Sequence, residues 1–169
     1  MPTTARLSPA VPLVAAMFVA LLATTPAKAE RETLGVHGGW AAFRDDDPKR
    51  CYAIAAPQTR TRGAYAAVAN WPERRVAGQV HFRFQRPARP GSAVVLTVDD
   101  KLFQLAARGA DAWAPTAGAD RAIVAAMRTG VGMTVRTRDV NGVAMAFGYA
   151  LNGAATAIDA AALACRPER

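Results

Sequence analysis

The feature of this sequence that most constrains its fold is a series of short apolar runs, each closed by a turn signal. In residues 75–84 the side chains alternate, so that Phe82 and Phe84 fall on one face and His81 and Arg83 on the other. Runs of this length, separated by Gly, Pro, Asn and Asp, are typical of antiparallel strands joined by tight turns. We therefore expect six to eight short strands, with candidates at 40–43, 51–56, 64–71, 75–84, 93–98, 102–105, 133–138 and 143–151.

Two segments follow a helical period instead. Residues 120–128 carry an apolar stripe, with Asp120 placed to cap the start of the helix and Gly130 to end it. A second helix is predicted for residues 153–165, with Asn152 as its cap. The inward face of this second helix is expected to carry Ile158, Ala162 and Cys165.

These elements predict an α+β fold that is mainly β. We expect an antiparallel meander, folded as a sandwich or an open barrel, with the mid-chain helix and the C-terminal helix on its edge or face. A single domain should span residues 39–166, preceded by a flexible leader over residues 30–38. Residues 109–118 are expected to form a loop around Trp113.

Residues 1–29 have the three parts of a secretory signal peptide. A basic start with Arg6 is followed by an uncharged apolar stretch over residues 11–23, and Ala29 completes an A-x-A site before Glu30. The apolar stretch is short for a membrane span, which takes about 20 residues. We expect cleavage between Ala29 and Glu30, a location in the periplasm or the outer envelope, and no transmembrane segment after cleavage. An uncleaved membrane anchor is the alternative.

The mature part contains two cysteines, Cys51 and Cys165. An even number of cysteines in an oxidising compartment predicts a disulfide. The bond would close a loop of more than a hundred residues, for which the chain-entropy model gives a stabilisation of roughly 4–5 kcal/mol. The sequence lacks the C-x-x-C spacing of a redox-active dithiol, and two lone cysteines do not form a zinc site.

The chain is basic, with 21 lysines and arginines against 13 aspartates and glutamates. Removing Arg6 and Lys28 with the signal lowers the formal net charge from +8 to +6. This balance favours contact with an anionic glycan or a lipid head group. The basic residues are dispersed rather than clustered, so we expect general basicity and no nucleic-acid binding.

The sequence offers no catalytic constellation and predicts neither a cofactor nor a metal site. Ser92 lies in a Pro-Gly-Ser turn, outside any nucleophile-elbow pattern, and His37 and His81 are expected to be solvated. The acidic run of residues 45–47 lacks the alternating oxygen ligands of a calcium loop and is expected to form a solvated turn. A hydrolase built from dispersed carboxylates is the enzymatic alternative.

Three tryptophans are the largest side chains in the mature part, which is rich in alanine. We expect Trp40, Trp71 and Trp113 to supply core area that alanine lacks. The alternative is a surface role for Trp71 with the neighbouring Arg74 and Arg75, because tryptophan and arginine are enriched at interaction surfaces.

A further pattern extends over most of the mature part. Its segments are Gly39-Trp40, Cys51-Tyr52-Ala53, residues 94–103, Gly109-Ala110-Asp111-Ala112-Trp113, residues 124–130 and residues 149–165. Together they resemble the invasion-associated locus B family of exported proteobacterial proteins. The resemblance implies a periplasmic or envelope-associated protein with structural cysteines and without an established enzymatic mechanism. His37-Gly38-Gly39 departs from the Phe-Gly-Asp that is usual in that family.

The function expected from the sequence is therefore binding rather than catalysis. We expect an exported envelope protein whose partner is another envelope protein. A polyanion or outer-membrane glycolipid binder is the alternative suggested by the basic charge, and the hydrolase is the other alternative.

Overall fold

The computed structural model describes Met1 and residues 31–166. The predicted signal peptide after Met1 and the predicted cleavage site, Ala29 and Glu30, lie outside the described residues. Within the described part, no helix has the length and apolar character needed to cross a membrane.

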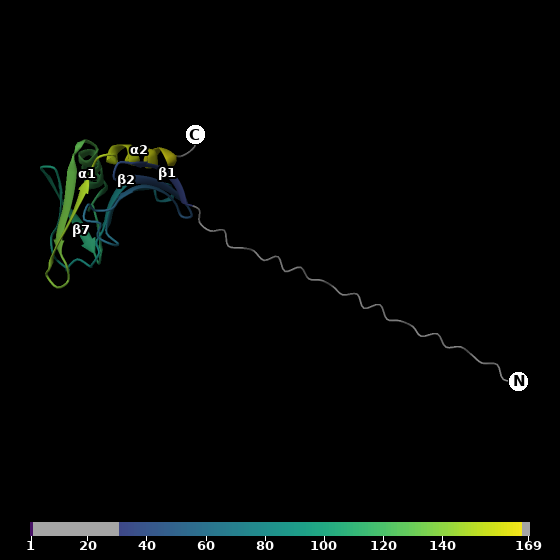
Figure 1. The fold of residues 1–169 in the computed structure, drawn as a ribbon, viewed down its shortest axis with the longest axis horizontal. Coiled ribbons are helices and arrows are strands. Elements are labelled where there is room, and N and C mark those ends of the chain that lie inside the picture. Colours follow the sequence, from purple (N-terminus) through teal and green to yellow (C-terminus); the bar gives the residue numbers. More distant parts are fainter. Residues whose placement is uncertain (2–30, 167–169) are drawn as a thin grey trace.

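One antiparallel sheet of ten strands makes up most of the domain, with two α-helices packed on it (Figure 1). The strand order is β1-β2-β3-β4-β5-β8-β7-β6-β9-β10. This architecture confirms the mainly β, α+β class that the alternating runs predict. The strands are β1 (Arg31–His37), β2 (Trp40–Asp46), β3 (Lys49–Ala55), β4 (Tyr65–Trp71), β5 (Val76–Arg83), β6 (Val94–Val98), β7 (Lys101–Arg108), β8 (Asp111–Trp113), β9 (Gly132–Arg138) and β10 (Ala144–Ala150).

The sheet bends so that its two halves face each other across the core. Phe84, which follows β5, stacks on Phe147 of β10 with 5.7 Å between ring centroids, and Phe82 of β5 meets Tyr149 of β10 at 6.0 Å. The buried Trp40 donates its indole N–H to the carbonyl of Ala150 at 2.9 Å. These contacts join β2 and β5 to β10, although none of these strand pairs is hydrogen-bonded in the sheet.

A close approach of two turns fixes the same junction. Gly153, which has φ of 85°, lies directly against the β1–β2 turn. A Cβ atom at this position would stand 1.9 Å from the carbonyl oxygen of His37. Only glycine is accommodated here, and the turn after β10 therefore packs tightly on the turn between β1 and β2.

The two helices pack on the sheet. Helix α1 (Ala117–Thr129) contacts mainly β5, and helix α2 (Ala154–Ala164) contacts β1, β2 and β3. Figure 1 shows α2 lying across β1 and β2. The cap of α1 is Thr116, whose hydroxyl accepts from the N–H of Ala119 at 3.1 Å, so the predicted cap Asp120 is wrong.

The predicted disulfide is present. Cys51 of β3 and Cys165 at the end of α2 are both buried, with their Cα atoms 5.7 Å apart. The bond ties α2 to the third strand across 114 residues of chain. Ile158 and Cys165 face inward as expected, but Ala161 replaces the half-buried Ala162 on that face. The predicted cap Asn152 is also wrong, because the N-cap of α2 is Gly153 without a side-chain hydrogen bond.

Two strands were not predicted. The segment expected to be a flexible leader forms β1, the edge strand that pairs with β2. The segment expected to be a loop around Trp113 contains β8, which is inserted between β5 and β7. Neither strand carries a long apolar alternation, because β1 is mostly exposed and β8 has three residues.

Candidate functional site

The face of the sheet that points away from α2 and the core carries a row of arginines and aromatic rings. It begins with Trp71, the last residue of β4, which is followed by the short 3-10 helix Pro72–Arg74. The guanidinium of Arg74 lies 4.8 Å from the centroid of the Trp71 ring. Trp71 and Arg74 are therefore in contact on the surface of the protein. This contact is compatible with the surface role that the sequence offers as an alternative for them.

Arg75, the third residue of the predicted interaction surface, has a different position. It adopts a left-handed backbone conformation with φ of 54° and ends the 3-10 helix. Its backbone N–H donates to the carbonyl of Pro72 at 3.0 Å. Arg75 thus shapes the turn that presents Arg74.

Cross-strand pairing extends this surface over three more strands. The guanidinium of Arg50 lies 4.8 Å from the Tyr52 ring and 5.4 Å from the Trp71 ring. Arg31 of β1 lies 5.7 Å from the Phe43 ring and 5.9 Å from the Tyr52 ring. Guanidinium and ring thus alternate across the sheet. We call the set Arg31, Phe43, Arg50, Tyr52, Trp71 and Arg74 the arginine–aromatic face.

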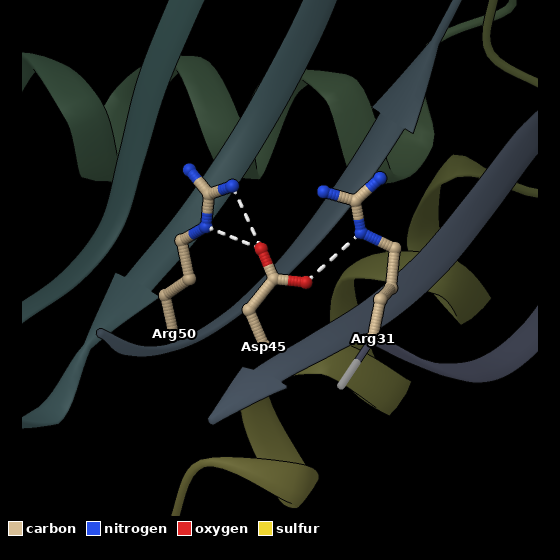
Figure 2. Close-up of polar contacts among 3 residues, drawn as sticks. All are labelled: Arg31, Asp45 and Arg50. Carbon is tan, nitrogen blue, oxygen red and sulfur yellow. Dashed lines mark hydrogen bonds and ion pairs between the residues drawn. The ribbon is translucent and has the colours of Figure 1, made fainter. Parts of the chain in front are cut away.

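A single carboxylate links two of these arginines, as Figure 2 shows. Asp45 accepts from Nε of Arg31 at 2.9 Å through Oδ1, and its Oδ2 lies 2.7 Å from Nη2 of Arg50. Burial alone raises the pKa of Asp45, but the hydrogen bonds from the two guanidinium groups outweigh it and the pKa lies below its usual value. Asp45 is therefore a buried anion that holds two cations in place, and the predicted solvated turn is wrong at this residue.

This arrangement fixes the arginines before any partner arrives. Each cation–π contact at an exposed site contributes about 0.5–1 kcal/mol. The side chain of Arg50 is 34% exposed and has a ring on either side. An arginine held in this way loses less conformational entropy on binding than a free one. The face therefore presents positive charge and aromatic area with fixed geometry.

A second cluster lies further along the same face, on β4, β5 and β8. His81 stacks on Trp113 with 5.1 Å between centroids and an interplanar angle of 9°, and the edge of Tyr65 meets it at 5.4 Å. Asp111 lies 2.8 Å from Nε2 of His81 and also pairs with Arg83. The prediction of a solvated histidine is therefore wrong.

The tryptophans thus divide between core and surface. Trp40 is buried as expected, whereas Trp71 and Trp113 are half-buried on the outer face of the sheet. The expectation that all three form the core is wrong for these two. Sequence adjacency gave Trp71 and Arg74, but Arg31, Arg50 and Tyr52 join them only through strand register, for which the sequence carries no local signal.

The remaining residues considered for chemistry lie apart from this face. Ser92 lies in the turn before β6, where its backbone N–H donates to the carbonyl of Arg89. His37 ends β1 at the turn against Gly153. In the described part of the chain, no three His, Cys, Asp or Glu side chains gather as a metal site would require.

Comparison with known protein families, with curated proteins and with solved structures finds no match to this chain.

Proposed function

We propose that this protein is an exported protein of the cell envelope that acts by binding, and that the arginine–aromatic face is its binding surface. The observation that carries the proposal is the alternation of guanidinium groups and aromatic rings across four strands. Tyrosine, tryptophan and arginine are the residues that dominate the energy of protein interfaces.

The charge of the face indicates the chemistry of the partner. The face has three arginines, and the carboxylate of Asp45 pairs with two of them, Arg31 and Arg50, so the set carries an excess of positive charge. Arg31 and Arg74 are exposed, and the fork of N–H donors on a guanidinium suits carboxylates on a partner. The partner that fits best is an envelope protein with an acidic surface, because complementary charge speeds encounter and fixes orientation.

Five aspartates of the described part support binding over catalysis because each has a structural partner. Asp45 and Asp111 each pair with two basic side chains. Asp120 accepts from the backbone N–H of Val80 at 2.8 Å. Asp99 accepts from the backbone N–H groups of Val131 and Gly132, as Asp139 does from those of Asn141 and Val143.

The location in the envelope rests on the signal-peptide features of residues 1–29 and on the resemblance to the invasion-associated locus B family. The buried disulfide agrees with both, because such bonds persist in oxidising compartments. Family membership, export and location are parts of this same proposal.

Crosslinking in living cells tests the proposal. A photo-crosslinking residue replaces Thr33, which is exposed and lies opposite Phe43 in the sheet. A second label replaces Leu163, which is exposed on α2 and serves as the control position. We expect a reproducible protein adduct from position 33 and none of the same mass from position 163.

Charge reversal then identifies the contact. Arg74→Glu should abolish the adduct, while Arg121→Glu, an exposed arginine on α1 with the same change in charge, should leave it intact. The proposal fails if position 33 yields no adduct, or if both reversals weaken it equally. Mass determination of the mature protein tests export separately, since cleavage predicts a chain that begins at Glu30.

A further inference from the structure

The tip of the β9–β10 hairpin projects from one end of the domain (Figure 1). Two other connections meet it there. Ala88, in the segment between β5 and β6, forms a bridge with Asp139 at the tip, and its N–H donates to the carbonyl of Gly109 in the β7–β8 turn. This end of the molecule, which we call the hairpin end, is therefore built from three connections held together by backbone hydrogen bonds.

The hairpin end gathers basic residues that are far apart in the sequence. Two carboxylates accompany them, Asp111 and Asp139, and both are already engaged. Asp111 pairs with Arg83 and His81, and the fully buried Asp139 lies 3.1 Å from Nε of Arg86. The arginines of the hairpin end are Arg83, Arg86, Arg89, Arg108, Arg136 and Arg138.

Four of these arginines form no ion pair with any described residue. Arg89, Arg108, Arg136 and Arg138 are all exposed. Arg138 donates from Nη1 to the carbonyl of Gly142 at 2.9 Å, and the guanidinium of Arg89 lies beside the same glycine. Like charges that converge without a carboxylate repel each other, and an anionic ligand would relieve the repulsion.

Two shallow grooves separate these arginines on the outer face of the sheet. The first, of about 550 Å³, has Arg89 and Arg108 in its lining, and the second, of about 590 Å³, has Arg136 and Arg138. Ser92 and Ala93 line both grooves, so the grooves are adjacent. Their floor is small and uncharged, since it includes Ala93, Ala106, Ala144 and Ala146.

The tip itself is apolar. Val140 is 53% exposed and Val143 is 52% exposed, on either side of the Asn141-Gly142 turn. The unpaired Arg89 and Arg138 lie beside Gly142 in this turn. The projecting tip therefore combines the two features of a membrane-surface contact, which are apolar side chains for the interface and cations for lipid phosphates.

We propose that the hairpin end docks on an anionic lipid surface, with Arg89, Arg108, Arg136 and Arg138 contacting headgroup phosphates in the two grooves. Val140 and Val143 enter the interfacial layer. A guanidinium fork suits phosphate oxygens because it donates two parallel hydrogen bonds. The exposed valines favour a lipid surface over a soluble polyanion, which would offer them no apolar contact. This docking is independent of the arginine–aromatic face.

Vesicle sedimentation of the purified protein tests the proposal. The protein should bind vesicles of phosphatidylcholine with a third phosphatidylglycerol and leave pure phosphatidylcholine vesicles unbound. Binding should weaken as salt is raised, because the screening length contracts from about 10 Å at 0.1 M to about 3 Å at 1 M. The double variant Arg108→Ala/Arg136→Ala should weaken binding by about tenfold or more, since it removes half of the unpaired arginines.

A variant with the same net charge provides the control. Lys101→Ala/Arg121→Ala removes two charges from the opposite end of β7 and from α1, and should change binding by less than about twofold. Val140→Ser/Val143→Ser should reduce binding without changing its salt dependence. Equal losses in both double charge variants would show diffuse attraction and overturn the proposal.

Two further outcomes would also overturn it. One is the absence of binding to the anionic vesicles in low salt. The other is a soluble anionic polysaccharide that binds as tightly as the vesicles while the valine variant behaves as wild type. That result would assign the grooves to a soluble polyanion. Crosslinking from position 33 should persist in the Arg108→Ala/Arg136→Ala variant, so failure of the lipid proposal and failure of the partner proposal can be told apart.

Discussion

The arginine–aromatic face and the hairpin end use the same residue type in opposite ways. On the face, Arg31 and Arg50 are held by Asp45 and by aromatic rings. At the hairpin end, Arg108 and Arg136 have no ion-pair partner among the described residues and border an alanine floor. A fixed guanidinium contributes to the stability of the fold and recognises one geometry. An unpaired one contributes little to stability and remains available to many phosphates.

The two regions also differ in how they are anchored. Strand β3 carries Cys51 on the inner side and Arg50 and Tyr52 on the outer side, so the disulfide lies directly behind the arginine–aromatic face. Helix α2 packs mainly on β1, β2 and β3. The hairpin end is built instead from the β9–β10 tip, the segment between β5 and β6, and the β7–β8 turn. We therefore expect that a mutation in one region changes the stability of that region more than the stability of the other.

The largest effect is expected from the disulfide. Cys51→Ser should lower the free energy of unfolding by roughly 4–5 kcal/mol, the value that the chain-entropy model gives for a loop of this length. Cys165→Ser should cost the same, and the double variant no more, because all three remove one bond. Urea denaturation of the oxidised proteins measures this.

Hydrogen exchange in the same variants sharpens the comparison. Amides of β3 should lose protection well before those of β9. An unchanged urea midpoint in both single variants would contradict a structural role for the bond. Equal loss of protection in β3 and β9 would show that the two regions are not anchored separately.

The second largest effect is expected at Asp45. Asp45→Ala leaves Arg31 and Arg50 without their carboxylate and should lower the free energy of unfolding by about 1.5–3 kcal/mol, the range measured for hydrogen bonds to charged groups. Asp45→Asn keeps the shape and should cost less. Thermal denaturation gives both values, and a loss in Asp45→Asn equal to that in Asp45→Ala would show that charge carries the whole effect.

Much of the fold could be predicted from the sequence because the signals were local. The Asn141-Gly142 turn between two alternating segments is sufficient to specify the β9–β10 hairpin. Strand β1 escaped prediction because it is an exposed edge strand whose pairing with β2 needs no apolar face. Strand β8 escaped because three residues between β5 and β7 are held by neighbours distant in sequence.

The candidate sites also divide into contacts that have a local sequence signal and contacts between segments that are distant in the sequence. Trp71 and Arg74 were found because they are three residues apart in the sequence, and the short helix between them brings them together. Arg50 contacts Trp71 only because β3 pairs with β4 in one register. The four arginines of the grooves meet through three separate connections, and for this reason the sequence predicted only dispersed basic charge.

A smaller effect is expected from removing one arginine of each region. Arg50→Ala should lower the free energy of unfolding by about 1 kcal/mol, because it removes two ring contacts and a partner of Asp45. Arg136→Ala should change stability by less than about 0.5 kcal/mol, as surface substitutions usually do. Chemical denaturation compares the two. Equal losses in the free energy of unfolding would contradict the distinction between fixed and unpaired arginines.

The last effect, a gain in stability rather than a loss, is expected from a carboxylate that lacks an arginine. Burial raises the pKa of Asp120, and the hydrogen bond from the N–H of Val80 only partly opposes this. A raised pKa in the folded state means that stability falls as the pH rises from the ordinary value of this carboxyl group toward its folded value. Asp45 behaves oppositely: its lowered pKa gives a contribution that is present above the ordinary value and is lost as the pH falls through the folded value.

Asp120→Asn should therefore raise the free energy of unfolding at neutral pH by less than about 1 kcal/mol, since the amide oxygen can still accept from Val80. The gain should vanish in acid, where the wild-type carboxyl is already neutral. In Asp45→Asn the sign reverses, with a loss at neutral pH that disappears in acid. Urea denaturation at a series of pH values measures both. The free energy of unfolding should change with pH in opposite directions at a carboxylate stabilised by two cations and at one that lacks them. Parallel pH profiles in the two variants would therefore mean that Arg31 and Arg50 do not stabilise the Asp45 carboxylate.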